Sequence, residues 1–159
     1  MDFLLSPVPN AVRFSVPSEW NILLEKPLAQ FVYNSSHPLE LDSSLIKPLN
    51  KEHVGQMLSL TSLTKPGPFF TNTIEFGNYF GIFDNDTLVS MAGSRLSPYQ
   101  YTEISAVCTH PNYLGRGYAG NLIKNQINIL LSQGQIPFLH AYSDNPAISL
   151  YKKLGFECR

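Results

Sequence analysis

The sequence predicts an α+β domain, an α/β/α sandwich with helices on both faces of a mixed, mostly antiparallel sheet. Two apolar runs flank a short turn, as in a β-hairpin, and a long stretch has helical periodicity. A short apolar strand follows that helix, which predicts a β-α-β unit near the C-terminus. The 159 residues are the size of one ordinary domain, and 43% of them are apolar against 14% charged, enough for a core.

Residues 1–44 are expected to form an N-terminal extension packed on a domain that spans residues 45–159. Prolines interrupt the extension repeatedly. The fragments between them suggest a strand over Ala11–Val16 and short helices over Trp20–Leu24 and Pro27–Tyr33. The first residues lack the basic region of a signal peptide and have only a short apolar run. No function follows from this extension.

A regular pattern begins at residue 45. Leu45–Leu49 predicts a short strand, and Asn50 is a plausible N-cap for a helix over residues 51–64. Lys65-Pro66-Gly67-Pro68 ends that helix. One face of the helix is expected to carry Val54, Met57, Leu58 and Thr61.

Three strands of an antiparallel meander are predicted next. Tyr79–Phe83 and Leu88–Leu96 flank Asp84-Asn85-Asp86-Thr87, a turn sequence typical of a hairpin. Tyr101–Thr109 is rich in residues that favour strands and is the third of the three.

The best-defined helix follows the meander and ends near Gly134. Ile136–Tyr142 is a short apolar strand, and Asn145–Leu154 predicts a last helix that stops at Gly155. The order β-α-β-β-β-α-β-α therefore closes with a right-handed βαβ unit. The apolar stripe of the long helix consists of Ala119, Leu122, Ile123, Gln126, Ile127 and Leu130.

Charge and cysteine content exclude several classes of function. The formal net charge of -1 favours neither nucleic acid nor an anionic membrane as a partner. Cys108 and Cys158 make neither a disulfide framework nor a zinc-site spacing, so two free thiols are expected. No stretch approaches the roughly 18 apolar residues of a membrane span. We expect a cytoplasmic protein without a metal.

A glycine-rich turn joins the third meander strand to the long helix: Val107-Cys108-Thr109-His110-Pro111-Asn112-Tyr113-Leu114-Gly115-Arg116-Gly117-Tyr118-Ala119. Unpaired N–H groups at a helix start attract anions, and Gly115 and Gly117 would let phosphate oxygens approach the backbone. Arg116 could add a charged contact. An ordinary tight turn is the alternative. The spacing excludes the GxGxxG and Walker fingerprints.

A second block, Ser143-Asp144-Asn145-Pro146-Ala147-Ile148-Ser149-Leu150-Tyr151-Lys152-Lys153-Leu154-Gly155-Phe156, follows the last strand. Together the two blocks resemble the GNAT superfamily of acetyl-CoA-dependent N-acetyltransferases, over residues 45–159. Three further stretches resemble a bacterial-type subfamily: Lys65–Phe69, Met91–Gly93 and Glu103–Pro111. The resemblance implies a sheet splayed between its fourth strand, Tyr101–Thr109, and its fifth, Ile136–Tyr142.

The resemblance also implies how acetyl-CoA would be held. Backbone groups of the fourth strand would pair with pantetheine, the glycine turn would cradle the pyrophosphate, and Asn145 would contact the pantetheine arm. Leu114 occupies a motif position that is normally Gln or Arg, so one phosphate contact would be missing. The implied cofactor-binding residues are Val107, Cys108, Thr109, Leu114, Gly115, Arg116, Gly117, Tyr118, Ala119 and Asn145.

Direct transfer to an amine is the implied chemistry, with Tyr151 giving a proton to the leaving thiolate and Glu103 acting as base. Each role has an alternative. Tyr151 could be a packed aromatic residue, and Glu103 an ion-paired carboxylate. His140 is a rival base or a core residue. His110 is interpreted as structural, and Cys108 is a buried thiol rather than a nucleophile.

The chain departs from the family in other ways. Asn145 lies six residues before Tyr151, one fewer than in many relatives. Members of the fold usually end with two strands, but only Phe156–Arg159 remains here. The N-terminal extension could complete the sheet, another chain could do so, as in a homodimer, or the edge could be open.

Two functions therefore stay open. The first is an acetyltransferase acting on the primary amine of a small molecule or amino acid. The loops Lys65–Asn72 and Leu96–Tyr101, which would form the acceptor pocket, are not acidic. The second is a non-catalytic acyl-CoA-binding module on the same fold.

Overall fold

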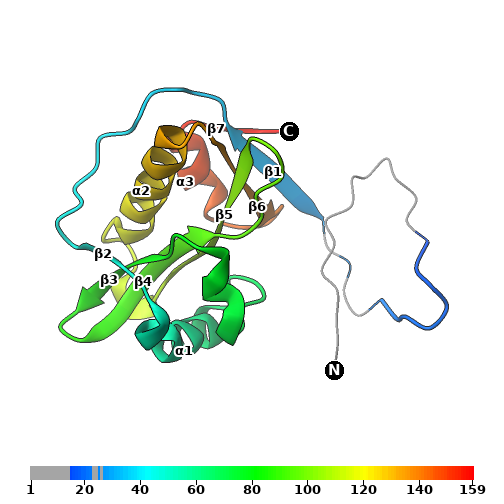
Figure 1. The fold of residues 1–159 in the computed structure, drawn as a ribbon, viewed down its shortest axis with the longest axis horizontal. Helices are drawn as coiled ribbons and strands as arrows, with labels where there is room; N and C mark the ends of the chain where they lie inside the picture. The colour runs from blue at the N-terminus through cyan, green and yellow to red at the C-terminus, as the bar shows by residue number, and fades with distance from the viewer. Residues whose placement is uncertain (1–14, 23–24, 26) are drawn as a thin grey trace.

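The computed structural model describes residues 15–22, 25 and 27–159. Seven strands form one sheet in the order β2-β3-β4-β5-β6-β1-β7 (Figure 1). The strands are β1 (Leu28–Tyr33), β2 (Ile46–Pro48), β3 (Phe80–Asp84), β4 (Thr87–Ser94), β5 (Tyr101–Thr109), β6 (Ile136–Tyr142) and β7 (Phe156–Cys158). The helices are α1 (Val54–Thr64), α2 (Tyr118–Ser132) and α3 (Ile148–Lys153), with 3-10 turns η1 (Lys51–His53), η2 (Thr71–Phe76) and η3 (Pro111–Tyr113).

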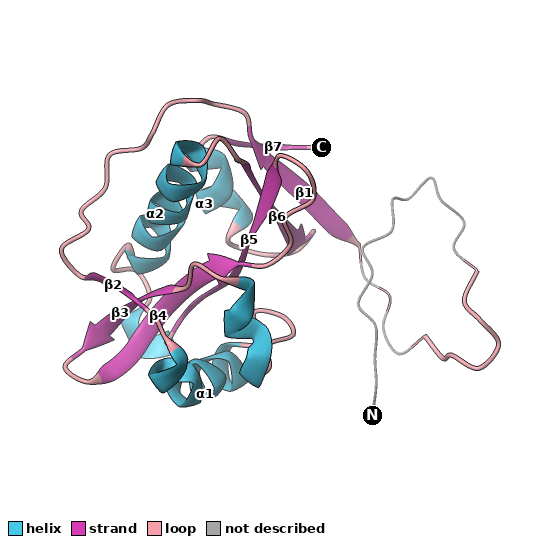
Figure 2. Cartoon of the chain, viewed as in Figure 1, coloured by secondary structure: helices cyan, strands magenta, loops and turns pink. Residues whose placement is uncertain are grey.

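The helices cover the two faces of the sheet, as the sandwich prediction requires (Figure 2). On one face, α2 and α3 pack against β1, β5, β6 and β7. On the other face, α1 packs against β4 and β5. The predicted stripe of α2 is buried from Leu122 to Leu130, and Gly134 follows the helix with a φ of 71°, as expected for a helix stop. The predicted mixed sandwich fold is confirmed.

The predicted elements between residues 45 and 109 are present. The side chain of Asn50 accepts a hydrogen bond from the Glu52 N–H, which caps the first turn of the helical stretch over residues 51–64. Strands β3 and β4 form the predicted hairpin, and β4 pairs antiparallel with β5. The last helix begins at Ile148 rather than at Asn145, because the Asn145 side chain accepts from the Ala147 N–H and holds a turn there.

The parallel strands β5 and β6 pair only over their first three residues, Tyr101–Glu103 against Ile136–Phe138. Beyond Glu103 and Phe138 the two strands separate, and we call this region the splay. A β-bulge lies in β5 just beyond this point. Ser105 pairs with Gly93 and Cys108 with Met91, so β5 has one more residue than β4 over this stretch. Within the bulge, Ala106 has a φ of 52°. A bulge bends its strand, so it turns β5 away from β6. The splayed sheet predicted from the resemblance is therefore present.

The N-terminal segment contributes an interior strand to the sheet, next to the edge strand β7. Strand β1 lies between β6 and β7 and pairs antiparallel with both. The prediction of a helix over Pro27–Tyr33 is therefore wrong. Alternate residues of β1 face opposite sides, so that Phe31 and Tyr33 are buried beneath α3. Of the three ways to complete the sheet, the chain uses its own N-terminal segment.

Other predictions concern the segment before β1. The described part of the predicted helix at Trp20–Leu24 is irregular, and the rest of it lies outside the described residues. Most of the predicted strand Ala11–Val16 also lies outside the described residues. So do the first residues of the chain, which are predicted not to form a signal peptide. Among the described residues, no helix is both long and apolar enough to cross a membrane.

Candidate active site

The glycine turn before α2 leaves a row of backbone donors without partners. Gly115 and Gly117 both have left-handed backbones, with φ of 77° and 78°. The first turn of α2 begins directly after them, and the first helical hydrogen bond is from the Asn121 N–H to the Gly117 carbonyl. Within the described residues, no N–H group of residues 115–120 donates a hydrogen bond. Six consecutive free donors and the positive end of a 15-residue helix are features that attract an anion.

Space for a ligand exists at this turn. A Cβ placed on Gly115 or Gly117 would meet no heavy atom within 4 Å, so the backbone is open on that side. The Arg116 guanidinium lies 4.7 Å from the centre of the Tyr113 ring, and the Tyr113 hydroxyl donates to Asp84 at 2.6 Å. These contacts hold Arg116 beside the free donors. Leu114 is 66% exposed and adds no polar contact.

The β5 wall of the splay offers main-chain groups as well. The His110 N–H donates to the Val89 carbonyl. In an antiparallel pair every second residue is hydrogen-bonded to the partner strand, so the next such pair is Cys108 with Met91. The main-chain groups of Val107 and Thr109 then point toward β6, which has already separated from β5. An extended ligand entering the splay could pair with them in the manner of an added strand.

Tyr151 lies on α3, on the face of the sheet that α2 and α3 cover. Its ring is 6% exposed and packs against Phe31 and Phe156, with ring centres 6.0 and 6.3 Å away. Burial raises the pKa of Tyr151, so its hydroxyl keeps its proton at neutral pH. Asn145 is half-buried in the turn before α3.

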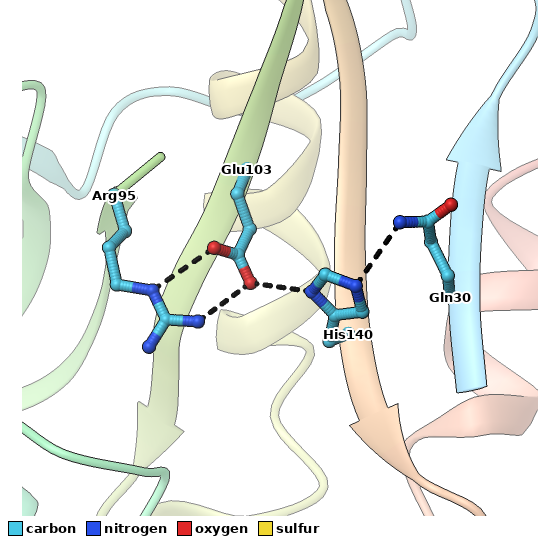
Figure 3. Close-up of polar contacts among 4 residues, drawn as sticks. All are labelled: Gln30, Arg95, Glu103 and His140. Carbon is cyan, nitrogen blue, oxygen red and sulfur yellow. Dashed lines mark hydrogen bonds and ion pairs between the residues drawn. The ribbon is translucent and has the colours of Figure 1, made fainter. Parts of the chain in front are cut away.

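A polar cluster lies at the narrow end of the splay, on the opposite face of the sheet from Tyr151. Glu103 is the last β5 residue paired with β6, and its side chain is 2% exposed. Arg95 donates two hydrogen bonds, of 3.0 and 2.8 Å, to the Glu103 carboxylate. His140 Nδ1 lies 3.0 Å from Glu103 Oε1, and His140 Nε2 lies 3.2 Å from the amide nitrogen of Gln30 (Figure 3).

The cluster keeps Glu103 charged. Burial favours the neutral form of this carboxyl, but the hydrogen bonds from His140 and Arg95, together with their charges, outweigh it. The pKa of Glu103 therefore lies below its usual range. A carboxylate held in this way is a weak proton acceptor, but it fixes the orientation of an imidazole that donates to it.

Two other groups near the site are held neutral. Cys108 is buried against α1, and burial raises the pKa of its thiol to about 11, so it carries little thiolate. Tyr79 packs over Gly93 and its hydroxyl has no hydrogen-bond partner among the described residues. Burial raises the pKa of Tyr79 to about 12. His110 accepts from the Asn112 N–H and caps η3, which fits the structural role predicted for it.

Sequence reasoning missed Arg95 and Gln30. Arg95 could have been found by counting across the predicted turn between β4 and β5, because this register brings it to Glu103. No comparable signal exists for Gln30, because it lies 110 residues from His140 in a segment interpreted as helical.

Two surface cavities adjoin the loops predicted to form the acceptor pocket. One, of about 270 Å³, has Ser97 and Tyr99 of the β4–β5 turn in its wall. The other, of about 340 Å³, is lined by residues that include Phe70 and Asn72. Phe76 lines both. Within the described residues, no group of three or more His, Cys, Asp or Glu side chains could hold a metal.

Comparison with known structures places this fold in a class. A GNAT-family acetyltransferase from Novosphingobium aromaticivorans is 34% identical, with a TM-score of 0.86 over 92% of this chain and 66% of that one. A GNAT-family acetyltransferase from Colwellia psychrerythraea is 18% identical, with a TM-score of 0.70 over 84% of this chain and 53% of that one. A Mycobacterium tuberculosis protein solved in complex with CoA is 12% identical, with a TM-score of 0.60 over 70% of each chain. No curated protein matches the sequence significantly.

The splayed sheet and the glycine turn before α2 are thus those of a GNAT fold. The chain spans 66% and 53% of the lengths of the first two relatives. Residues 79–159, more than half of the chain, match the model of the FR47-like protein family. The chain belongs to the FR47-like family of the GNAT superfamily.

Proposed function

We propose that this protein is an N-acetyltransferase that uses acetyl-CoA. The observation that carries the proposal is the row of free N–H groups over residues 115–120, directly beside the splay of β5 and β6. A pyrophosphate needs such donors, and a pantetheine arm needs an extended main-chain partner. One ligand that contains both parts in sequence is CoA.

Each part of acetyl-CoA has a proposed partner. The backbone of Gly115–Ala119 would hold the pyrophosphate, with Arg116 supplying a positive charge next to it. The main chain of Val107–Thr109 would pair with pantetheine. Asn145, whose Oδ1 is occupied by the Ala147 N–H, would use its remaining amide donors on the arm. Leu114 would contribute packing only.

The proposed reaction is direct transfer. The lone pair of an uncharged amine forms a bond to the thioester carbon, and the carbonyl becomes an oxyanion. The oxyanion collapses, the carbon–sulfur bond breaks, and the sulfur leaves as a thiolate. The attacking nitrogen loses a proton to a base, and the thiolate takes a proton from the Tyr151 hydroxyl.

His140 is the better supported proton acceptor, with Glu103 orienting it. The Glu103 carboxylate already accepts hydrogen bonds from Arg95 and His140, and its pKa is lowered. The His140 side chain is 14% exposed at the narrow end of the splay. A base must reach the nitrogen that it deprotonates, so the more accessible imidazole fits this role better. Direct action of Glu103 through a water stays a prediction.

The proposed acceptor is the primary amine of a small molecule or an amino acid. Cavities of about 270 and 340 Å³ beside the acceptor loops suit a small ligand. Glu75 is the one acidic residue in either wall, so these cavities offer little to a polycation.

Two glycines provide a matched test of the CoA site. Gly117 and Gly134 have φ of 78° and 71°, and a Cβ on either would meet nothing within 4 Å. Alanine at each position should therefore cost a similar stability, about 1–2 kcal/mol. We expect calorimetry to show at least tenfold weaker acetyl-CoA binding for Gly117→Ala and unchanged binding for Gly134→Ala. Equal affinities in the two variants, or no affinity in the wild type, would contradict the proposal.

A non-catalytic acyl-CoA-binding module is the second candidate, favoured by the exposed Leu114 at a position where relatives usually contact phosphate. Consumption of acetyl-CoA with a panel of small amines and amino acids separates the two. Binding without turnover of any amine would support the module.

A further inference from the structure

The imidazole of His140 is held on two sides by side chains from different strands. Glu103 of β5 contacts its Nδ1, and Gln30 of β1 contacts its Nε2 (Figure 3). Gln30 and His140 are direct partners in the β1–β6 register, so the strand pairing itself brings the amide to the ring. The N-terminal strand therefore reaches the polar cluster as well as completing the sheet.

These contacts define the tautomer of His140. A carboxylate oxygen only accepts, so Nδ1 must carry a proton and donate it to Glu103. The amide nitrogen of Gln30 only donates, so Nε2 must accept. The neutral ring therefore keeps its lone pair on Nε2. Because Gln30 donates to that lone pair in the resting protein, its amide must turn away before Nε2 can take a proton from an attacking amine or from a water between them.

We infer that Gln30 is a positioning residue for the transfer reaction, which serves His140 in both of its charge states. An amide has a donor and an acceptor on the same carbon. Its nitrogen donates to the neutral ring, and a half-turn of the amide brings its oxygen to accept from the protonated ring. A carboxylate or an alkyl chain at the same position could satisfy only one of these states or neither. The inference rests on the proposed function.

The other groups around the His140 ring do not replace Gln30 as the partner of Nε2. On β1, the residues that face His140 are Leu28, Gln30 and Val32, none of which ionises. The groups that do ionise on this face are Tyr101 and Glu103 of β5, Arg95 after β4 and Tyr142 of β6. Tyr79 lies beside Arg95 and Glu103, and Glu157 and Arg159 lie on the far side of β1, where their side chains bond to Asn34. Glu103 is bound to Nδ1 and Arg95 is bound to Glu103, whereas Gln30 contacts Nε2.

Two substitutions of Gln30 separate positioning from packing. Gln30→Met keeps the length and removes both hydrogen-bonding atoms, and Gln30→Glu keeps an acceptor but no donor. Gln56→Met and Gln56→Glu are matched controls, because Gln56 is exposed on α1, its side chain makes its hydrogen bonds with Asp86 and Leu88 of the hairpin, and it lines neither cavity. All four proteins would be compared with the wild type by thermal melting, by steady-state kinetics across pH, and by nitrogen NMR of the resting protein's imidazoles.

For Gln30→Met we expect a kcat about three- to tenfold lower, the size of one lost hydrogen bond, with KM for acetyl-CoA unchanged. For Gln30→Glu the carboxylate stabilises the protonated ring, so the acid limb of the pH–kcat profile moves to higher pH. The Gln56 variants should match the wild type in both respects.

The NMR measurement tests the inference even without turnover. We expect the wild-type spectrum of His140 to show Nδ1 protonated and Nε2 bare, and Gln30→Met to change it. A wild-type ring protonated on Nε2 alone, or a Gln30→Met protein with an unchanged spectrum and kcat, would overturn the inference. An expected spectrum together with no acetylation of any amine would instead count against the proposed function alone.

Discussion

Glu103 is the one charged side chain in the core of the described residues, and its neighbours explain why it is tolerated. An isolated carboxylate in such a place would be strongly disfavoured. Two hydrogen bonds from Arg95 and one from His140 replace the water that it loses. Such a group contributes little net stability, but removal of one partner leaves a buried charge unpaired.

Arg95→Met tests this balance. We expect the free energy of unfolding at neutral pH to fall by about 3–5 kcal/mol. The pKa of Glu103 is lowered in the folded protein, so its stabilising contribution is present above the usual pKa of 4.5 and is lost as the pH falls below it. Arg95→Met lacks much of this contribution, so the difference in free energy of unfolding between the wild type and the variant should become smaller in acid.

Urea unfolding between pH 3 and 7 measures that difference. Lys51→Met is the control, because the Lys51–Glu75 pair is exposed, at 83% and 59% of the two side chains, and should contribute almost nothing. A deficit for Arg95→Met that is constant across pH would rule out Glu103 as its cause.

Tyr151→Phe removes only a hydroxyl. If this hydroxyl protonates the leaving thiolate, kcat should fall at least tenfold while the affinity for acetyl-CoA is unchanged. Tyr33→Phe is the matched control, since Tyr33 is also buried and also packs on Phe156, while its hydroxyl bonds to the His37 carbonyl. Equal kcat values for the two variants would leave Tyr151 with a packing role alone.

Among the elements, those with local signals were predictable. The stripe of α2 and the β3–β4 hairpin depend on neighbours a few residues away, and both agree with the sequence. Strand β1 does not. Its Leu28, Phe31 and Val32 fit a helical spacing as well as a strand, and its partners begin more than 100 residues later. The same distance hid Gln30, whereas Glu103 and Tyr151 lie in recognisable motifs.

The contribution of β1 to the core can be measured at two positions. Phe31 is 1% exposed and packs on Tyr151, and Leu28 of the same strand is 41% exposed. Phe31→Ala should lower the free energy of unfolding by about 3–5 kcal/mol. Leu28→Ala should lower it by much less, because that side chain is more exposed. Equal losses in chemical denaturation would mean that β1 is held by its backbone pairing alone.

Seen as one molecule, the sheet is completed by a strand from the N-terminal part of the chain. The strand expected after β7 is supplied from the other end of the sequence. The Arg159 N–H donates to the Gln30 carbonyl, so the last residue lies against the start of β1. Because β1 and β7 are antiparallel, a short turn could join them directly.

A circular permutant tests this arrangement. The chain would begin near residue 35 and continue from Arg159 through a short Gly-containing turn into residues 27–34. We expect a cooperative thermal transition within a few degrees of the wild type and retained acetyl-CoA binding, since every strand keeps its neighbours. A permutant that unfolds or binds no acetyl-CoA would show that the connection after β1, which the permutation breaks, is itself needed.

The position of β1 also has a consequence for synthesis on the ribosome. The residues that pair with Leu28–Tyr33 lie between Phe138 and Cys158, so they are translated more than 100 residues after β1. Until they emerge, β1 is an extended apolar strand with neither neighbour, the kind of segment that aggregates or recruits chaperones. The β2–β5 part of the sheet can form earlier, and closure around β1 must wait until the residues up to Cys158 have left the ribosome. Nascent chains stalled before residue 136 should therefore leave β1 open to proteases.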